Sequence, residues 1–222
     1  MERHFDEEIQ ELTRDMRTMG ELAQEAIRKS IEALQNADLA KAQEVIEQDD
    51  RVDEQELLID EKCIDLMARY QPMAGDLRFL ATAMKINGEL ERIADLAVDI
   101  AQRVLELAGK SLVKPLEDIP RLSVIAQTMV SQSIESFINR DVELAKKVVL
   151  SDAEADRLRN KVQEDLVRDY MVKDARTVPS AVPLLLIARH LERMCDHTTN
   201  IAEEVIYIVD AKVVRHHREN LE

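Results

Sequence analysis

The sequence predicts an all-α protein made of two tandem three-helix bundles that are related by internal duplication. Helix breakers are scarce, with four Gly and five Pro in 222 residues, so good helix formers run on without interruption. Aromatic residues make up only 3% of the chain and Trp is absent, which leaves an aliphatic core. The third observation is a pattern that occurs twice, about 100 residues apart.

The repeated pattern fixes how the two halves correspond. Residues 30–38 (SIEALQNAD) resemble residues 133–141 (SIESFINRD), an offset of 103 residues. Asp49 corresponds to Asp152 at the same offset, whereas Glu91 corresponds to Glu192 at an offset of 101. The two residues lost between these points fit a shortened loop. We therefore divide the chain into a first three-helix repeat at 1–112 and a second at 113–222.

In the first repeat we expect helices at residues 6–35, 39–70 and 77–107. Asp38 is suited to cap the second helix, and Pro72 and Gly75 end it at the following turn. Asp76 is then expected to cap the third helix, with Gly109 close to its carboxyl end.

The second repeat follows the same scheme after a linker at residues 114–120, which contains two prolines. Its helices are expected at residues 121–139, 142–172 and 178–212, and Pro179 opens the last of them.

Composition limits the class of protein. A formal net charge of −15 argues against nucleic-acid binding and against a basic face that docks on anionic lipid. No signal peptide is evident, and the most apolar run, residues 181–188, is far shorter than the ~20 residues of a membrane span. Cys63 and Cys195 show no ligand spacing and indicate reduced, buried thiols. We expect a soluble cytoplasmic protein.

One carboxylate motif carries the strongest chemical information. The form E-R-x-x-D-x-x-x-[D/N]-I-A begins at Glu91 and again at Glu192, and a D-x-x-x-D pair precedes each, at Asp49 and Asp152. Spacings of four residues place these side chains on one helix face, where like charges are unfavourable without a cation. The candidate metal ligands are Asp49, Asp53, Glu91, Asp95 and Asp99 in the first repeat, and Asp152, Asp156, Glu192, Asp196 and Asn200 in the second.

The spacing also predicts which ligands meet. In an antiparallel helical hairpin, residues equidistant from the turn lie at one height. Asp53 and Glu91 are equidistant from residue 72, and so are Asp49 and Asp95. In the second repeat the pairs equidistant from residue 174 are Asp156 with Glu192 and Asp152 with Asp196. We therefore expect each pair to face across its hairpin.

Oxygen-only ligands favour hard ions such as Mg²⁺, Ca²⁺, Mn²⁺ or ferric iron. The Glu-x-x-His pairs of ferritin-like centres are missing, and His190 and His197 are not duplicated, so we interpret both as surface or interface residues. Glu21 and Glu25 are likewise not duplicated and are interpreted as surface residues. The alternative to metal binding is a solvated acidic face with salt bridges. The sequence holds no recognisable constellation of catalytic residues.

Taken together, the acidic motifs and the turn at residues 71–78 (QPMAGDLR) resemble the PhoU family over essentially the full length. The segments that carry the resemblance are residues 49–53, 71–78, 91–95 and 192–205. The second repeat departs from the first at Asn200, which replaces an Asp, so its site carries less charge. It also lacks a copy of the turn.

The resemblance implies a cytoplasmic, non-enzymatic regulator that restrains phosphate uptake and the phosphate-starvation response. It implies a homodimer that links the ATPase subunit of a phosphate ABC transporter to a sensor histidine kinase and reaches the membrane only through these partners. It further implies multinuclear metal sites containing iron, Mn, Mg or Zn. The alternatives are a metal-dependent phosphohydrolase and a metal-storage or metal-sensing bundle.

Overall fold

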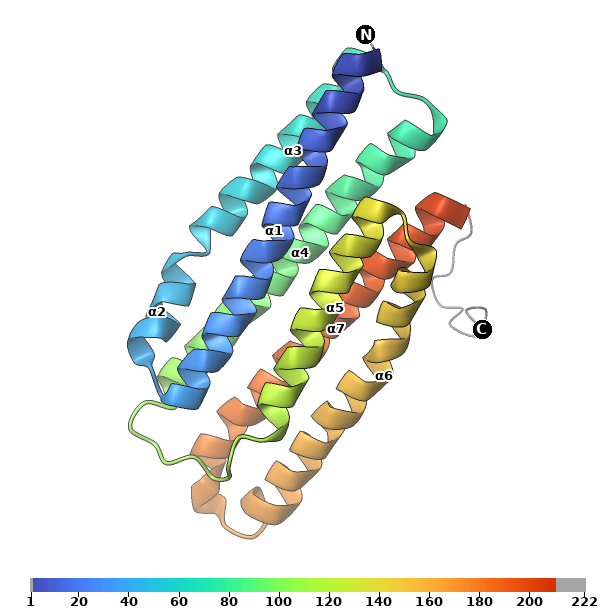
Figure 1. Cartoon of the computed structure of the whole chain (residues 1–222). Helices are drawn as coiled ribbons and strands as arrows, with labels where there is room; N and C mark the ends of the chain where they lie inside the picture. Colours follow the sequence, from blue (N-terminus) through green and yellow to red (C-terminus); the bar gives the residue numbers. More distant parts are fainter. Residues whose placement is uncertain (1, 211–222) are drawn as a thin grey trace.

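The computed structural model describes residues 2–210, and all regular structure in that range is helical (Figure 1). The elements are α1 (Glu2–Asn36), α2 (Leu39–Glu47), α3 (Asp50–Tyr70), α4 (Ala74–Glu106), α5 (Asp118–Asn139), α6 (Val142–Glu164), the π-helix η1 (Asp165–Met171), the 3₁₀-helix η2 (Ala175–Thr177) and α7 (Val178–Asp210). The all-α prediction is confirmed.

The helices form two bundles that lie side by side with their long axes roughly parallel (Figure 1). The first contains α1, α4 and the α2–α3 arm, and the second contains α5, α6 and α7. Helix α4 packs extensively on α7, and α1 packs on α5. The duplicated three-helix architecture is therefore confirmed, and the two repeats share a long interface.

The core is aliphatic, as the composition predicts. Its main aromatic contact stacks Phe79 of α4 on Phe137 of α5, with ring centroids 4.9 Å apart. Where α1 meets α5, a Cβ built on Gly20 would lie 3.0 Å from Cγ1 of Ile134. Gly20 therefore allows the two repeats to approach closely at this point.

The same capped turn occurs once in each repeat. Asp38 accepts a hydrogen bond from the Lys41 backbone N–H at 3.0 Å, which confirms it as the cap of α2. Its counterpart Asp141 accepts from the Leu144 N–H at 3.0 Å. The residue before each cap, Ala37 or Arg140, has a positive φ of 51° or 54°. The duplication thus extends to backbone conformation.

The helix expected at residues 39–70 is divided in the structure, since α2 ends at Glu47 and α3 begins at Asp50. Lys29 Nζ of α1 donates to Glu44 Oε1 at 2.6 Å and to Gln48 Oε1 at 2.8 Å, which ties the end of α2 to α1. The counterpart of Lys29 in the second repeat is Gln132, and there α6 runs on without a break. The break between α2 and α3 thus coincides with a contact between the end of α2 and Lys29 of α1.

Three other boundaries differ. Helix α4 begins at Ala74, so Asp76 lies in its first turn and the predicted cap is wrong; its charge there still suits the amino end of the helix dipole. Helix α5 begins inside the expected linker at Asp118, whose buried carboxylate accepts from Lys161 Nζ at 2.9 and 3.0 Å.

The helix expected to reach residue 172 becomes a π-helix at Asp165. Gly109, with φ of 71°, follows α4 as expected, and α7 begins at Val178. The expected end of the last helix at residues 211–212 lies outside the described residues. Within residues 2–210 no helix is both long and apolar enough to cross a bilayer.

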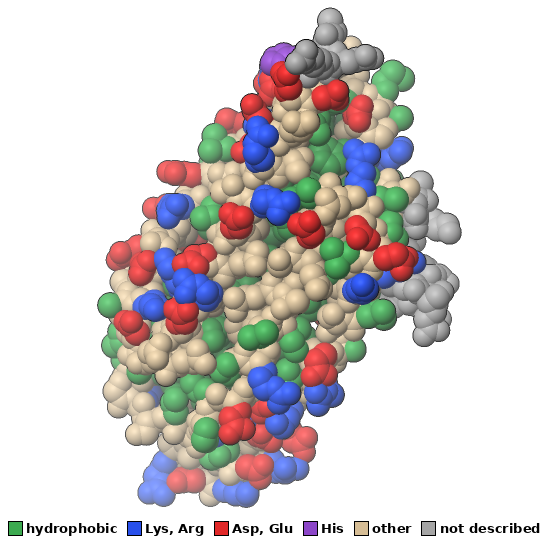
Figure 2. All heavy atoms as spheres, in the orientation of Figure 1, with side chains coloured by type: hydrophobic (Ala, Val, Ile, Leu, Met, Phe, Trp, Pro, Cys, Tyr) green, Lys and Arg blue, Asp and Glu red, His purple; other side chains and the backbone are tan. Residues whose placement is uncertain are grey.

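Charged side chains of both signs are interspersed over the face shown in Figure 2. Many pair within one helix, as Arg157 does with Glu154 at 2.9 Å and Arg168 with Glu164 at 2.6 Å. Such exposed pairs contribute little to stability. They contrast with the two clusters in which carboxylates meet other carboxylates.

Candidate functional site

The first acidic cluster lies where the α2–α3 junction meets α4. Burial, together with the negative charges of Asp95 and Asp53, raises the pKa of Asp49 to about 6. Repulsion between two carboxylates weakens as the distance between them grows, so a carboxylate that shifts another's pKa lies near it. The carboxylates of Asp49 and Asp95 therefore interact electrostatically, in agreement with the hairpin register.

Glu91 has the most strongly altered carboxyl group of this cluster. Burial, followed by the charges of Asp95 and then of Glu56 in α3, raises its pKa to about 7. Burial also raises the pKa of Glu56, and Asp53 is among the carboxylates that add to the effect. Glu56 is thus a cluster member that the sequence motif did not reveal. It lies three residues after Asp53 on the same helix face, but it is not duplicated.

The second acidic cluster lies between α6 and α7. Burial raises the pKa of Asp196, and Glu192, Asp152 and Asp156 add to the shift in that order. Asp196 therefore interacts electrostatically with the other three carboxylates that the sequence placed there.

An arginine distinguishes the second cluster from the first. Arg159 Nη2 of α6 donates to Glu192 Oε1 at 2.9 Å. At the repeat offset of 103 residues, Arg159 is the counterpart of Glu56. The first cluster therefore has a carboxylate where the second has a cation, and the two clusters differ in charge.

Asp99 and Asn200 make their contacts between α4 and α7. Asp99 Oδ2 lies 3.7 Å from His190 Nδ1, and Asn200 Nδ2 donates to Glu89 Oε2 at 3.1 Å. Glu89 and His190 are counterparts at the offset of 101, as are Asp99 and Asn200, so these are two copies of one contact. The structure places both residues at the contact between the repeats.

Glu89 also meets His197, whose Nδ1 lies 2.6 Å from Glu89 Oε2. Burial acts to raise the pKa of Glu89, but hydrogen bonds with His197 and Asn200 hold it below its usual value. Both histidines thus lie at the interface of the repeats.

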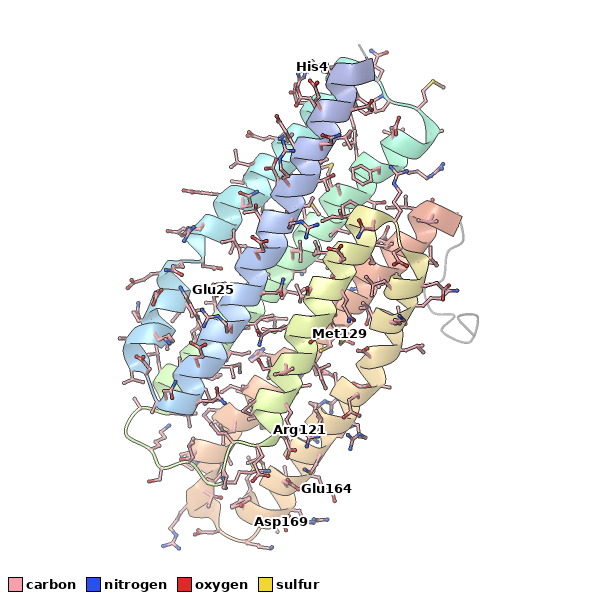
Figure 3. All side chains as sticks on the ribbon, viewed as in Figure 1. His4, Glu25, Arg121, Met129, Glu164 and Asp169 are labelled. Carbon is pink, nitrogen blue, oxygen red and sulfur yellow. The ribbon has the colours of Figure 1, made fainter. Side chains whose placement is uncertain are left out.

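The donor set of the first cluster fits a hard cation, because its candidate ligands are all carboxylates. Burial, and then neighbouring negative charge, raises the pKa values of Asp49 and Glu91. Within residues 2–210, no three His, Cys, Asp or Glu side chains form a group that could hold a metal ion as they stand. Asp49 also lines a pocket of about 390 Å³ that includes Glu21 and Glu25 of α1. Glu25, labelled in Figure 3, accepts a hydrogen bond from Arg28 in its own helix. The negative charge of this α1 carboxylate is therefore already paired with a cation.

The two thiols are buried among apolar side chains. Burial raises the pKa of the Cys63 thiol to about 12 and raises that of Cys195 as well. Both remain protonated at neutral pH, a form that is a poor nucleophile.

The fold and its clusters define a class: a duplicated three-helix bundle with one acidic cluster in each repeat. A family model described as the PhoU domain matches residues 16–104 and again residues 119–205. The chain belongs to the PhoU family.

Among its relatives is a phosphate-specific transport system accessory protein PhoU homolog of Aquifex aeolicus, 40% identical over 94% of each chain. The phosphate-specific transport system accessory protein PhoU of Escherichia coli K12 is 32% identical over 96% of this chain and 88% of its own length.

Two solved structures of PhoU proteins have a similar fold. The crystal structure of PhoU from Pseudomonas aeruginosa has a TM-score of 0.89 and 33% identity, covering 94% of this chain and 100% of that one. The phosphate transport system regulatory protein PhoU from Streptococcus pneumoniae has a TM-score of 0.88 and 27% identity, covering 95% and 99%.

Proposed function

We propose that the chain is a regulatory accessory protein of a phosphate transport system. The observation that carries this proposal is its similarity, over nearly the whole length, to relatives that bear that name. In its finer form, a cytoplasmic homodimer links the transporter's ATPase subunit to a sensor histidine kinase and restrains uptake and the starvation response. Two bundles joined by a long interface offer separate surfaces for two such partners.

The protein acts by binding rather than by catalysis. Its buried thiols support this reading, since they are protonated at neutral pH. The two site histidines support it too, because each is held at the contact between the repeats. A general base must instead reach a substrate proton.

We further propose that the acidic clusters bind metal ions, among iron, Mn, Mg and Zn. In the first cluster Asp49, Asp53, Glu91 and Asp95 would hold the ion, which would offset their mutual repulsion and tie α3 to α4. In the second cluster Asp152, Asp156 and Asp196 would hold it more weakly, because Arg159 already engages Glu192.

The test is deletion of the gene in its own cell, followed by a phosphate-starvation reporter in high phosphate. We expect derepression that the wild-type chain restores and that Asp95→Asn/Asp196→Asn does not. The matched control is Glu61→Gln, an exposed acid of α3 away from the cluster motifs, which should restore repression fully. Pull-down of the transporter ATPase with each variant shows whether a variant that fails to restore repression is still present and has lost binding to the ATPase.

Two results would overturn the proposal. One is a reporter that stays silent after deletion. The other is turnover of a phosphoester by the purified metal-loaded protein at a rate typical of enzymes, about 1 per second or more.

A further inference from the structure

A second pocket of about 390 Å³ lies between α6 and α7. Helix α6 lines it with Arg159 and Gln163, and α7 lines it with Arg189, Glu192, Arg193 and Asp196. The α7 positions recur at spacings of three to four residues, so they share one face of the helix. Three guanidinium groups therefore converge on one concavity in a chain whose formal net charge is −15.

Two of these arginines form no hydrogen bond or ion pair within the described chain. They are Arg189 and Arg193, and both are exposed. Arg159 donates through Nη2 to Glu192 and through Nη1 to Asn160 at 2.8 Å and to Gln163 Oε1 at 3.4 Å, while its buried Nε has no partner within the described chain. The pocket thus holds donor capacity that the protein itself does not use.

The first repeat provides an internal comparison. At the repeat offsets, the counterparts of the six polar lining residues are Glu56, Asp60, Gly88, Glu91, Arg92 and Asp95. That set contains one arginine and four carboxylates, whereas the pocket contains three arginines and two carboxylates. Across these six positions the formal charge therefore changes from −3 to +1, while the neighbouring pairs Asp49/Asp53 and Asp152/Asp156 are acidic in both repeats. The second repeat is thus more positive than the first at these positions, which favours binding of an anion.

We propose that the pocket between α6 and α7 binds a phosphate-bearing small anion, either free phosphate or the phosphate chain of a nucleotide. Guanidinium groups match phosphate oxygens with paired hydrogen bonds. Glu192 and Asp196 can accept a hydrogen bond from a protonated phosphate oxygen or a sugar hydroxyl, groups that sulfate lacks at neutral pH. The first repeat would then hold the cation, and the second would hold the anion beside its more weakly bound cation.

The regulatory meaning of such binding rests on the proposed function, since a bound phosphate would report supply directly to the regulator. Binding itself is measured on the purified full-length chain, so the reporter experiment and the binding experiment can fail independently.

The experiment is isothermal titration calorimetry of the chelator-treated protein with inorganic phosphate, ATP or sulfate at constant ionic strength. We expect saturable binding of phosphate or ATP that is tighter than that of sulfate. The Arg189→Gln/Arg193→Gln variant should bind at least about tenfold more weakly, because hydrogen bonds between charged groups are lost. Both side chains are exposed and unpartnered, so the melting temperature should not change, and Arg193→Gln alone should give an intermediate loss.

The matched control is Arg78→Gln/Arg92→Gln, which removes the same charge from exposed positions of the first repeat. Its affinity should equal that of the wild type. Tighter binding of ATP than of phosphate would identify the nucleotide as the source, and the reverse would identify the free anion. No saturable binding, equal affinity for sulfate, equal loss in the control variant, or binding that requires added metal would each overturn the proposal.

Discussion

Glu91 and Glu192 occupy equivalent positions in the two repeats but have opposite surroundings. Burial and then the charges of Asp95 and Glu56 raise the pKa of Glu91, whereas Glu192 accepts a hydrogen bond from Arg159. A single exchange of Glu for Arg on the neighbouring helix accounts for this difference. Residue chemistry thus separates two sites that the backbone makes alike.

The raised pKa values predict how stability depends on pH in the metal-free protein. The folded pKa of Glu91, about 7, exceeds its ordinary value of 4.5, so its stabilising contribution is complete below about pH 4.5 and is lost as pH rises through 7. Glu91→Gln should match the wild type at pH 5 and melt a few degrees higher at pH 8, since about 1 kcal/mol changes Tm by about 2–4 °C.

Thermal melts in excess chelator at the two pH values measure this effect. Glu192→Gln is the control, and it should melt lower than the wild type at both pH values because it leaves Arg159 without its carboxylate. A Glu91→Gln variant that is less stable than the wild type at pH 8 would show that the carboxylate repulsion is absent.

The charge difference between the clusters predicts unequal metal binding. Added Mn²⁺ should raise the melting temperature of the chelator-treated wild type, because the ion binds only the folded chain. Asp95→Asn should remove most of that increase, whereas Asp196→Asn should remove less, since Arg159 already offsets charge in the second cluster. Thermal shift across a Mn²⁺ titration measures both, and equal losses in the two variants would contradict the difference in charge.

At the scale of the elements, the two capped turns are the clearest trace of duplication. Asp38 and Asp141 each close the first turn of a helix with a side-chain hydrogen bond of 3.0 Å. Asp38→Ala and Asp141→Ala should each lower the free energy of unfolding by about 1 kcal/mol, within a range of about 0.5–2. Asp76→Ala is the control, because Asp76 lies inside α4 and caps nothing, so it should cost less. Urea denaturation distinguishes them, and a loss for Asp76→Ala equal to the others would contradict the assigned caps.

At the scale of the whole molecule, the repeats are held together by close contact of α1 with α5 and of α4 with α7. Gly20 sets the first of these distances, since Ile134 occupies the space that a side chain would need. The contact is therefore sensitive to volume at one position.

Gly20→Leu should destabilise the protein by about 1–3 kcal/mol through overpacking between α1 and α5. Gly88→Ala provides the contrast, because a Cβ at Gly88 meets no atom within 4 Å, and it should stabilise α4 by about 0.5–1 kcal/mol. Guanidinium denaturation of both variants tests the difference. A Gly20→Leu variant as stable as the wild type would show that the repeats can separate here without cost.

The sequence by itself determined the helical class, the duplication and the register of each hairpin. These features follow from local or periodic signals: few breakers, a capping Asp before each second helix, and carboxylates spaced four apart on either side of a turn. Asp95 is among the charges that raise the pKa of Asp49, and Asp152 is among those that raise the pKa of Asp196, which agrees with that register.

Only the tertiary structure decided what completes each cluster and what lies between the repeats. Glu56 and Arg159 are unremarkable in sequence because neither is duplicated, and their effect arises only from a facing helix. The break between α2 and α3 and the pairing of Asp99 with His190 likewise depend on a neighbouring helix. Helical periodicity reports which face a residue occupies, but the identity of the opposing helix is set by packing between segments far apart in the chain.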